Sequence, residues 1–185
     1  IPTRGFNKSE FEERLIKAQK IMLEEKLDGI FLTTPANIRY FSGFDTQFWE
    51  SPTRPWFLVV PQKGNPIAVI PEIGLPAMSL TWLDEILTWP SPVPSDDGIS
   101  ILQKTIDSLP KRFGRFGSEL GYEMSLRMPV IDFLKLKNNI STELVDASKA
   151  IWDIRMIKTK SEISHISYIC SIVSDAYEEV QNNIS

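Results

Sequence analysis

The segment from residue 28 to residue 37, Asp-Gly-Ile-Phe-Leu-Thr-Thr-Pro-Ala-Asn, decides the fold class. Residues 29–33 form a short apolar run that is typical of a buried strand. The Pro-Ala-Asn sequence after it predicts a turn that enters a brief helix. Before it, apolar residues recur at helical spacing behind a capping-box sequence that begins at Ser9. A helix that leads into a strand across a tight link predicts an α/β fold.

Strands and helices alternate along the rest of the chain. The apolar runs at 56–60 and 67–70 are separated by a loop rich in Pro and Gly, which suits an antiparallel hairpin. Further strands are expected at 84–89, 115–118 and 142–145, and helices at 97–109 and 128–137. This alternation predicts a mixed β-sheet with helices on both faces.

The last part of the sequence carries a strong helix signal. Thr159 is a good N-cap, and Glu162 can reach back to the N–H of the cap, as in a capping box. An apolar stripe follows at helical spacing: Ile163, Ile166, Ile169, Cys170, Val173, Tyr177, Val180 and Ile184. The stripe needs a cover, either the domain's own sheet or a following domain, and its place after the last strand favours the second. We therefore divide the chain into a domain at 1–150 and, at 151–185, a linker with a connector helix that leads to a further domain.

Composition excludes several classes of protein. The chain has 185 residues, a formal net charge of −4 and scattered basic residues, so nucleic acid is not an expected partner. No apolar run approaches a membrane span, and the first residues lack a signal-peptide core. The only cysteine, Cys170, cannot form an internal disulfide, which indicates a cytoplasmic location. Ile1 in place of Met indicates a piece of a longer chain.

The residue pattern assigns no catalytic and no metal-binding role within this chain. The Glu162-x-x-His165 pair lacks the further carboxylates of a metal cage. Cys170 lies on a different side of the predicted helix, and we expect it to be buried in apolar surroundings that raise its pKa. We therefore expect neither a metal site nor a cysteine nucleophile.

The loop of residues 41–56 is the most informative surface, because it combines many aromatic rings with one arginine. Rings can form a wall for a ligand, and an arginine can clamp a carboxylate through two hydrogen bonds. Three of the rings are expected in the core: Phe41, Phe44 and Trp56. The candidates for contact with a substrate are Phe48, Trp49 and Arg54. For these candidates, an ordinary surface role is an equal alternative.

Two motifs, in their order and spacing, carry a family resemblance. Residues 37–44, Asn-Ile-Arg-Tyr-Phe-Ser-Gly-Phe, are similar to an N-I-x-Y-x-S/T-G-F/W signature. Residues 145–148, which lead into residues 155–163, are similar to a domain junction that precedes a catalytic domain. On these motifs the chain resembles the amino-terminal domain of the creatinase, prolidase and aminopeptidase P family of pita-bread metallopeptidases.

The resemblance implies a non-catalytic domain of a homodimeric metallohydrolase. In this family the carboxy-terminal domain holds two divalent metals, here expected to be Mn, Co or Zn, through ligands that this chain does not contain. The amino-terminal domain mediates dimer contacts and lends loop residues to the active site of the partner subunit, which is the role implied for Phe48, Trp49 and Arg54. The implied parent is a Xaa-Pro dipeptidase or aminopeptidase that acts on small peptides, with this domain serving dimerisation, substrate access and specificity.

Two alternatives stay open. A creatinase-like or other small-molecule C–N hydrolase or lyase would keep the architecture and take a small carboxylate substrate. A non-enzymatic, peptidase-like module would use the same scaffold to bind a protein partner.

Overall fold

The structure is a computed structural model that describes residues 1–50 and 54–183, with the backbone alone at 181 and 182. Its elements in chain order are α1 (Lys8–Glu24), β1 (Gly29–Leu32), α2 (Pro35–Ser42), η1 (Gln47–Glu50), β2 (Phe57–Pro61), β3 (Ile67–Pro71), η2 (Glu72–Gly74), α3 (Leu75–Met78), β4 (Glu85–Trp89), α4 (Ile99–Ser108), β5 (Arg115–Ser118), α5 (Val130–Asn139), β6 (Glu143–Asp146), α6 (Ser148–Met156) and α7 (Lys160–Asn183). Every predicted strand and helix is present in this order, and η1, η2, α3 and α6 are additional elements.

The six strands form one sheet in the order β4-β3-β2-β1-β5-β6. β1, β2 and β3 pair antiparallel, which confirms the hairpin between residues 57 and 71. β4, β5 and β6 each run parallel to the strand beside them. The predicted mixed sheet is therefore confirmed, and β1 and β3 each pair antiparallel with β2 and parallel with their other neighbour.

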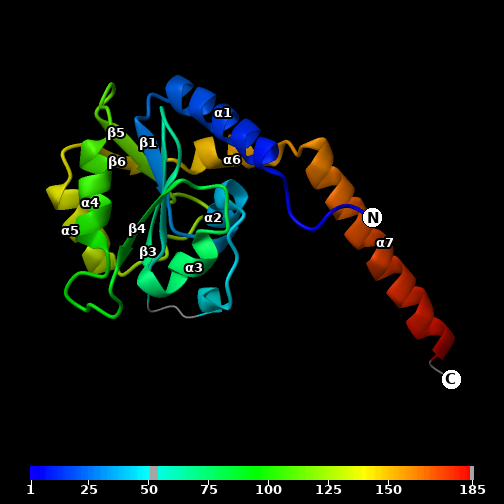
Figure 1. Cartoon of the computed structure of the whole chain (residues 1–185). Coiled ribbons are helices and arrows are strands. Elements are labelled where there is room, and N and C mark those ends of the chain that lie inside the picture. Colours follow the sequence, from blue (N-terminus) through cyan, green and yellow to red (C-terminus); the bar gives the residue numbers. More distant parts are fainter. Residues whose placement is uncertain (51–53, 184–185) are drawn as a thin grey trace.

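Helices cover both faces of the sheet (Figure 1). On one face, α1, α2 and α6 pack in a core that includes Ile30 and Leu32 of β1. On the other face, α4 and α5 pack in a core that includes Phe31. Successive side chains of a strand point to opposite faces, so the apolar run of β1 contributes to both cores. This arrangement confirms the predicted α/β fold.

The first helix begins earlier than the sequence predicts. Asn7, and not Ser9, is the N-cap of α1, because its side-chain oxygen accepts a hydrogen bond from the backbone N–H of Glu10 at 3.1 Å. The hydroxyl of Ser9 donates to the same Asn7 oxygen at 2.8 Å. Ser9 therefore supports the cap and does not provide it.

Helix α6 is absent from the sequence prediction, which treats residues 151–156 as the start of a linker. In the structure Ile151 and Ile154 are buried in the same core as α1. The expected boundary after residue 150 consequently falls inside a helix that belongs to the folded domain.

Helix α7 extends away from the rest of the domain (Figure 1). Residues 171–180 are all exposed, and Ile166 and Ile169 are exposed over 51% and 59% of their surface. Cys170 is exposed as well, so the expectation of a buried thiol is wrong: the part of α7 that carries it packs on no element of the described chain. Ile184, the last member of the predicted stripe, lies outside the described residues. None of the described helices is long and apolar enough to cross a membrane.

Candidate functional site

Polar residues gather at the edge of the sheet where its central parallel strands end. β1, β5 and β6 run parallel to one another, and Thr33 and Glu119 directly follow β1 and β5. In α/β proteins, ligands commonly bind outside the carboxyl ends of parallel strands, at a point where the strand order changes. This edge of the sheet is the candidate functional site.

Glu119 is the centre of this edge, and only 1% of its surface is exposed. Its Oε2 accepts hydrogen bonds from the backbone N–H of Thr33 at 2.6 Å, the hydroxyl of Thr33 at 2.8 Å and the backbone N–H of Thr34 at 3.1 Å. Its Oε1 accepts from the hydroxyl of Thr34 and the side-chain amide of Asn37. A buried carboxylate is tolerated when donors of this kind replace its water. Glu119 therefore joins the end of β5 to the turn between β1 and α2.

Asn37, the first residue of the signature motif, extends this network to α6. Its side-chain oxygen accepts a hydrogen bond from Nη1 of Arg155, while its amide donates to Glu119. A pocket of about 210 Å³ lies beside these groups and is lined in part by Thr34, Asn37 and Arg155. The polar groups of these three residues are already hydrogen-bonded within the network, and apolar side chains such as Ile151 and Trp152 complete the lining.

The predicted substrate-proximal residues differ in their exposure. Phe48 is 39% exposed. Trp49 is half-buried, and its ring lies 5.6 Å from that of Phe44 and 5.3 Å from that of Trp56. Arg54 is half-buried, and residues 51–53 before it lie outside the described residues. The contact of Phe48, Trp49 and Arg54 with a substrate in the partner subunit stays a prediction.

The three rings expected in the core are buried there. Phe41, Phe44 and Trp56 are exposed over 0%, 2% and 3% of their surface. They lie in the core between the sheet and α1, α2 and α6. The aromatic loop is thus attached to the domain by its two ends, and the residues between them contain the candidates for ligand contact.

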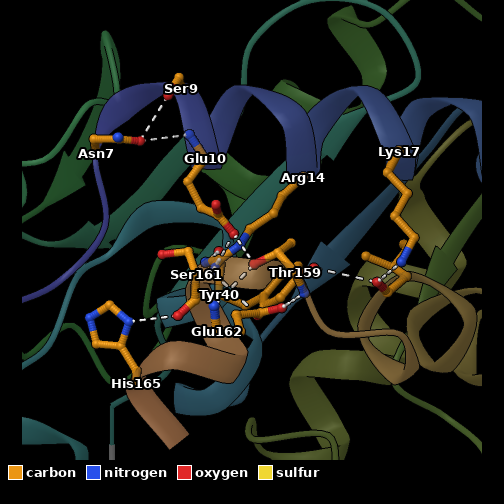
Figure 2. A network of polar contacts seen from close by, with 11 residues as sticks. Asn7, Ser9, Glu10, Arg14, Lys17, Tyr40, Thr159, Ser161, Glu162 and His165 are labelled. Atoms are coloured by element: carbon orange, nitrogen blue, oxygen red, sulfur yellow. Dashed lines mark hydrogen bonds and ion pairs between the residues drawn. The ribbon is translucent and has the colours of Figure 1, made fainter. Parts of the chain in front are cut away.

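A second polar cluster fastens the start of α7 to α1, as Figure 2 shows. The predicted capping box is present, because Thr159 N donates to Glu162 Oε2 at 2.8 Å and Glu162 N donates to Thr159 Oγ1 at 3.1 Å. Arg14, only 3% exposed, donates to Glu162 Oε1 at 3.2 Å and to Glu10 Oε1 at 3.3 Å. One arginine therefore joins a carboxylate of α1 to a carboxylate of α7.

Aromatic rings surround this arginine. The guanidinium carbon of Arg14 lies 4.2 Å from the ring centroid of Phe6 and 4.4 Å from that of Tyr40, and Arg14 also donates to the carbonyl of Tyr40 at 2.8 Å. Burial, and after it the charge of Glu162, raises the pKa of Tyr40 to about 12. The Tyr40 phenol therefore stays protonated at neutral pH and donates to the carbonyl of Ile154 at 3.3 Å.

The family of the chain is decided by one comparison. The family model described as the creatinase/prolidase N-terminal domain matches residues 14–157, more than half of the chain. The chain belongs to this family. The signature residue Asn37 and the junction residue Arg155 both lie within the matched range, and they contact each other in the structure.

Relatives of this creatinase/prolidase N-terminal domain include two curated proteins. The chain is 28% identical over 174 residues to the Xaa-Pro dipeptidase of Pyrococcus furiosus, a match that covers 89% of this chain and 41% of the relative. It is 29% identical over 166 residues to the creatinase of a Bacillus species, with 87% of this chain and 37% of the relative covered. The chain thus spans less than half the length of these relatives.

The fold is also similar to that of solved prolidases. The structure of recombinant prolidase from Thermococcus sibiricus matches with a TM-score of 0.75 at 22% identity, over 94% of this chain and 44% of that chain. This likeness supports the fold alone, because the identity is low.

The described residues of this N-terminal domain do not fit the two-metal centre that the family implies. They bring together no group of three or more His, Cys, Asp or Glu side chains that could hold a metal ion. His165 instead places its two ring nitrogens 2.8 Å from the carbonyl oxygens of Ser161 and Thr3.

The sequence patterns do not reveal Glu119 and Arg127 as residues of this site. For Glu119 a signal exists, because an acidic residue that directly follows a buried strand lies at the carboxyl edge of the sheet. For Arg127 the pattern gives no such signal, since its side chain contacts the carbonyl of a residue 78 positions earlier, Trp49.

Proposed function

We propose that this creatinase/prolidase N-terminal domain is the non-catalytic domain of a metallohydrolase of the Xaa-Pro dipeptidase type. The observation that carries the proposal is the similarity to the Xaa-Pro dipeptidase of Pyrococcus furiosus over 89% of this chain. In the proposed parent, a homodimeric cytoplasmic protein, this domain shapes substrate access and contributes to dimerisation. The two divalent metals, Mn, Co or Zn, belong to the rest of the parent.

The geometry of the aromatic loop supports a role in substrate access. Phe48 is exposed on η1, and Arg54 follows on the same loop before the buried Trp56. An exposed ring and a guanidinium on one loop can hold a small carboxylate such as the carboxy terminus of a dipeptide. In the proposed homodimer, Phe48, Trp49 and Arg54 approach the active site of the partner subunit.

A creatinase-like parent is the second candidate, and the 29% identity to the Bacillus creatinase favours it. Its substrate would be a small carboxylate with a different C–N bond, for which the same loop residues are suited. A non-enzymatic binding module is the alternative of another class, and it predicts a parent that lacks hydrolytic activity with every added metal.

The test is an activity assay of the parent protein together with this chain alone. With Mn²⁺ or Co²⁺ added, the parent is expected to hydrolyse Xaa-Pro dipeptides, and residues 1–185 alone are expected to hydrolyse none. Turnover of creatine-like substrates by the parent would favour the second candidate. Turnover by the purified chain alone would contradict the proposal.

The loop is tested separately in an active parent. Arg54→Ala is expected to weaken the binding of carboxylate substrates by roughly 1.5–3 kcal/mol, because it removes a charge-assisted hydrogen bond. The exposed Glu13→Ala, on the solvent side of α1, is the matched control. Unchanged kinetics in Arg54→Ala would show that Arg54 is an ordinary surface residue that does not contact the substrate.

A further inference from the structure

Arg127 connects the polar edge of the sheet to the aromatic loop. Its backbone N–H donates to the hydroxyl oxygen of Thr33 at 2.8 Å, and the hydroxyl of Thr33 in turn donates to Glu119 Oε2 at 2.8 Å. Its side chain extends to the loop, where Nη2 donates to the backbone carbonyl of Trp49. The arginine is thus fixed at its backbone by a buried network and holds the loop with its far end.

The ring of Trp49 lies on the inner side of the loop. It packs edge to face on Phe44, with an interplanar angle of 84°, and lies at 60° to the ring of Trp56. The guanidinium carbon of Arg127 is 5.9 Å from its centroid, within the range of a cation–π contact. Among the described residues, the buried indole N–H of Trp49 has no hydrogen-bond partner. The ring is therefore held by packing and by Arg127, and not by a hydrogen bond of its own.

Phe48 directly precedes Trp49 in the short helix η1. Because neighbouring residues of a tight helical turn point in different directions, the inward orientation of Trp49 determines where Phe48 points. Phe48 is the exposed one of the two rings, at 39% of its surface. A shift of the Trp49 backbone would move Phe48 with it.

We propose that Arg127 is a positioning residue that holds Trp49 as the inner anchor of the loop and so presents Phe48 to the substrate. This inference rests on the proposed function, in which the loop meets a small carboxylate, and it divides the work within the loop. Trp49 fixes the loop to the domain, and Phe48 contacts the substrate. Arg127, which is itself bound to the Glu119 network, keeps both residues in place. A loop fixed before binding loses less conformational entropy on binding.

The positioning is tested on this chain alone by ¹⁹F NMR with 5-fluorotryptophan. The chain contains five tryptophans, and Trp49 is assigned through the resonance that Trp49→Phe removes. Arg127→Met is expected to shift and broaden the Trp49 resonance while that of Trp89, in the core on the other face of the sheet, stays in place. Arg127→Lys, which keeps the charge and a donor, is expected to shift it less.

The matched control is Arg112→Met. It removes an exposed arginine that also makes a cation–π contact, with its guanidinium carbon 5.0 Å from the ring centroid of Phe113. It is expected to leave the Trp49 resonance unchanged. An unchanged Trp49 resonance in folded Arg127→Met would overturn the positioning role. Should Arg127→Met fail to fold, visible as the collapse of all the tryptophan resonances, the same readout on Arg127→Gln decides the question.

The consequence for substrate is tested in the parent with an Xaa-Pro dipeptide. Arg127→Met is expected to raise KM about fivefold, the equivalent of one lost hydrogen bond, with kcat changed by less than about twofold. Phe48→Ala is expected to show the same division between KM and kcat, and Arg127→Lys to restore part of the loss. Unchanged KM in Arg127→Met, with a shifted Trp49 resonance, would overturn the link to substrate.

The two proposals fail in different ways. A parent that hydrolyses no dipeptide contradicts the proposed function, while the ¹⁹F spectra still decide whether Arg127 positions the loop. A Trp49 resonance that is unchanged in Arg127→Met contradicts the positioning role whatever the activity of the parent.

Discussion

Glu119 and Ile169 lie in surroundings opposite to those that their side chains prefer. Glu119 is 1% exposed at the carboxyl edge of the sheet, whereas Ile169 is 59% exposed on α7. The buried carboxylate is tolerated because five donors replace its water. The exposed isoleucine belongs to a stripe that no described element covers. The two cores of the domain are thus closed within this chain, while α7 keeps an exposed apolar stripe of the kind that often marks a protein contact.

The same contrast exists within α7 itself. Its first turn is held by Arg14, by Glu10 and by its own capping box, whereas its residues 171–180 are exposed. A helix with this division keeps a fixed direction at its start and an open apolar face beyond it. Under the proposed function, a following domain covers that face.

The largest expected effect comes from removing the buried carboxylate. Glu119→Ala should destabilise the chain by roughly 3–5 kcal/mol, because it leaves several buried donors without an acceptor. Urea unfolding followed by circular dichroism measures the change. Glu13→Ala, at an exposed position of α1, is the control and should change the free energy of unfolding by less than about 0.5 kcal/mol. Equal stability of the two variants would show that the Glu119 network contributes little.

The same substitution at a buried and at an exposed isoleucine compares how much the core of the domain and the stripe of α7 contribute to the free energy of unfolding. Ile154→Ala, at a fully buried position of α6, should cost about 2–5 kcal/mol. Ile169→Ala, at an exposed position of α7, should cost less than about 0.5 kcal/mol in this chain. The comparison uses the same urea transition for both. A large cost of Ile169→Ala would show that the stripe is covered in solution, for example by a second copy of the chain.

The junction of α1 and α7 should give the next effect. Arg14→Met leaves Glu10 and Glu162 close to each other without their shared cation, and we expect a loss of roughly 2–4 kcal/mol. Arg14→Lys keeps the charge but loses the forked geometry, so it should recover only part of the loss. Hydrogen exchange of the first turn of α7 locates the effect. Protection that is unchanged in Arg14→Met would contradict the view that this arginine fastens α7.

The smallest effect is a pH dependence at the single histidine. Hydrogen bonds to the carbonyl of Ser161 and, after it, to that of Thr3 raise the pKa of His165 above its ordinary value of 6.5. A pKa that is higher in the folded state stabilises the fold below the unfolded pKa, and this contribution is lost as the pH rises through the folded pKa. The His165→Gln chain should therefore be less stable than the unsubstituted chain at about pH 5.5, and the two stabilities should become similar at about pH 9.

The measurement for His165 is the urea midpoint of both chains across this range, with the imidazole proton resonances of the only histidine followed in parallel. A difference between the chains that grows with rising pH would have the wrong sign and would contradict this role of the histidine. A titration at or below the ordinary pKa would contradict it as well.

Much of the fold could be predicted from the sequence because its signals are local. The apolar run at 29–33, the hairpin between residues 57 and 71 and the capping box at Thr159 each depend on residues close in the chain, and each is present. The N-cap of α1 was predicted two residues too late, because Ser9 and Asn7 are both good caps and only the geometry selects between them. α6 was missed because its short amphipathic pattern follows the last strand without a clear cap.

The candidate site could be predicted only in part. The core role of Phe44 and Trp56 follows from their place between a helix and a strand, and the structure confirms it. The anchoring of Trp49 by Arg127 could not be predicted, because it joins segments that are far apart in the sequence. The exposure of Cys170 was predicted wrongly for a related reason, since the apolar spacing of a helix does not reveal what covers it.

The sequence by itself determined the alternation of strands and helices, the family signature and the start of α7, because hydrophobic period and capping act over a few residues. Only the tertiary structure decided that Glu119 is buried among donors 82 to 86 residues earlier in the chain, and that the face of α7 is open. The physical reason is that the free energy of burying a group depends on its final neighbours, and these are set by how distant segments meet and not by the residues beside it in the chain.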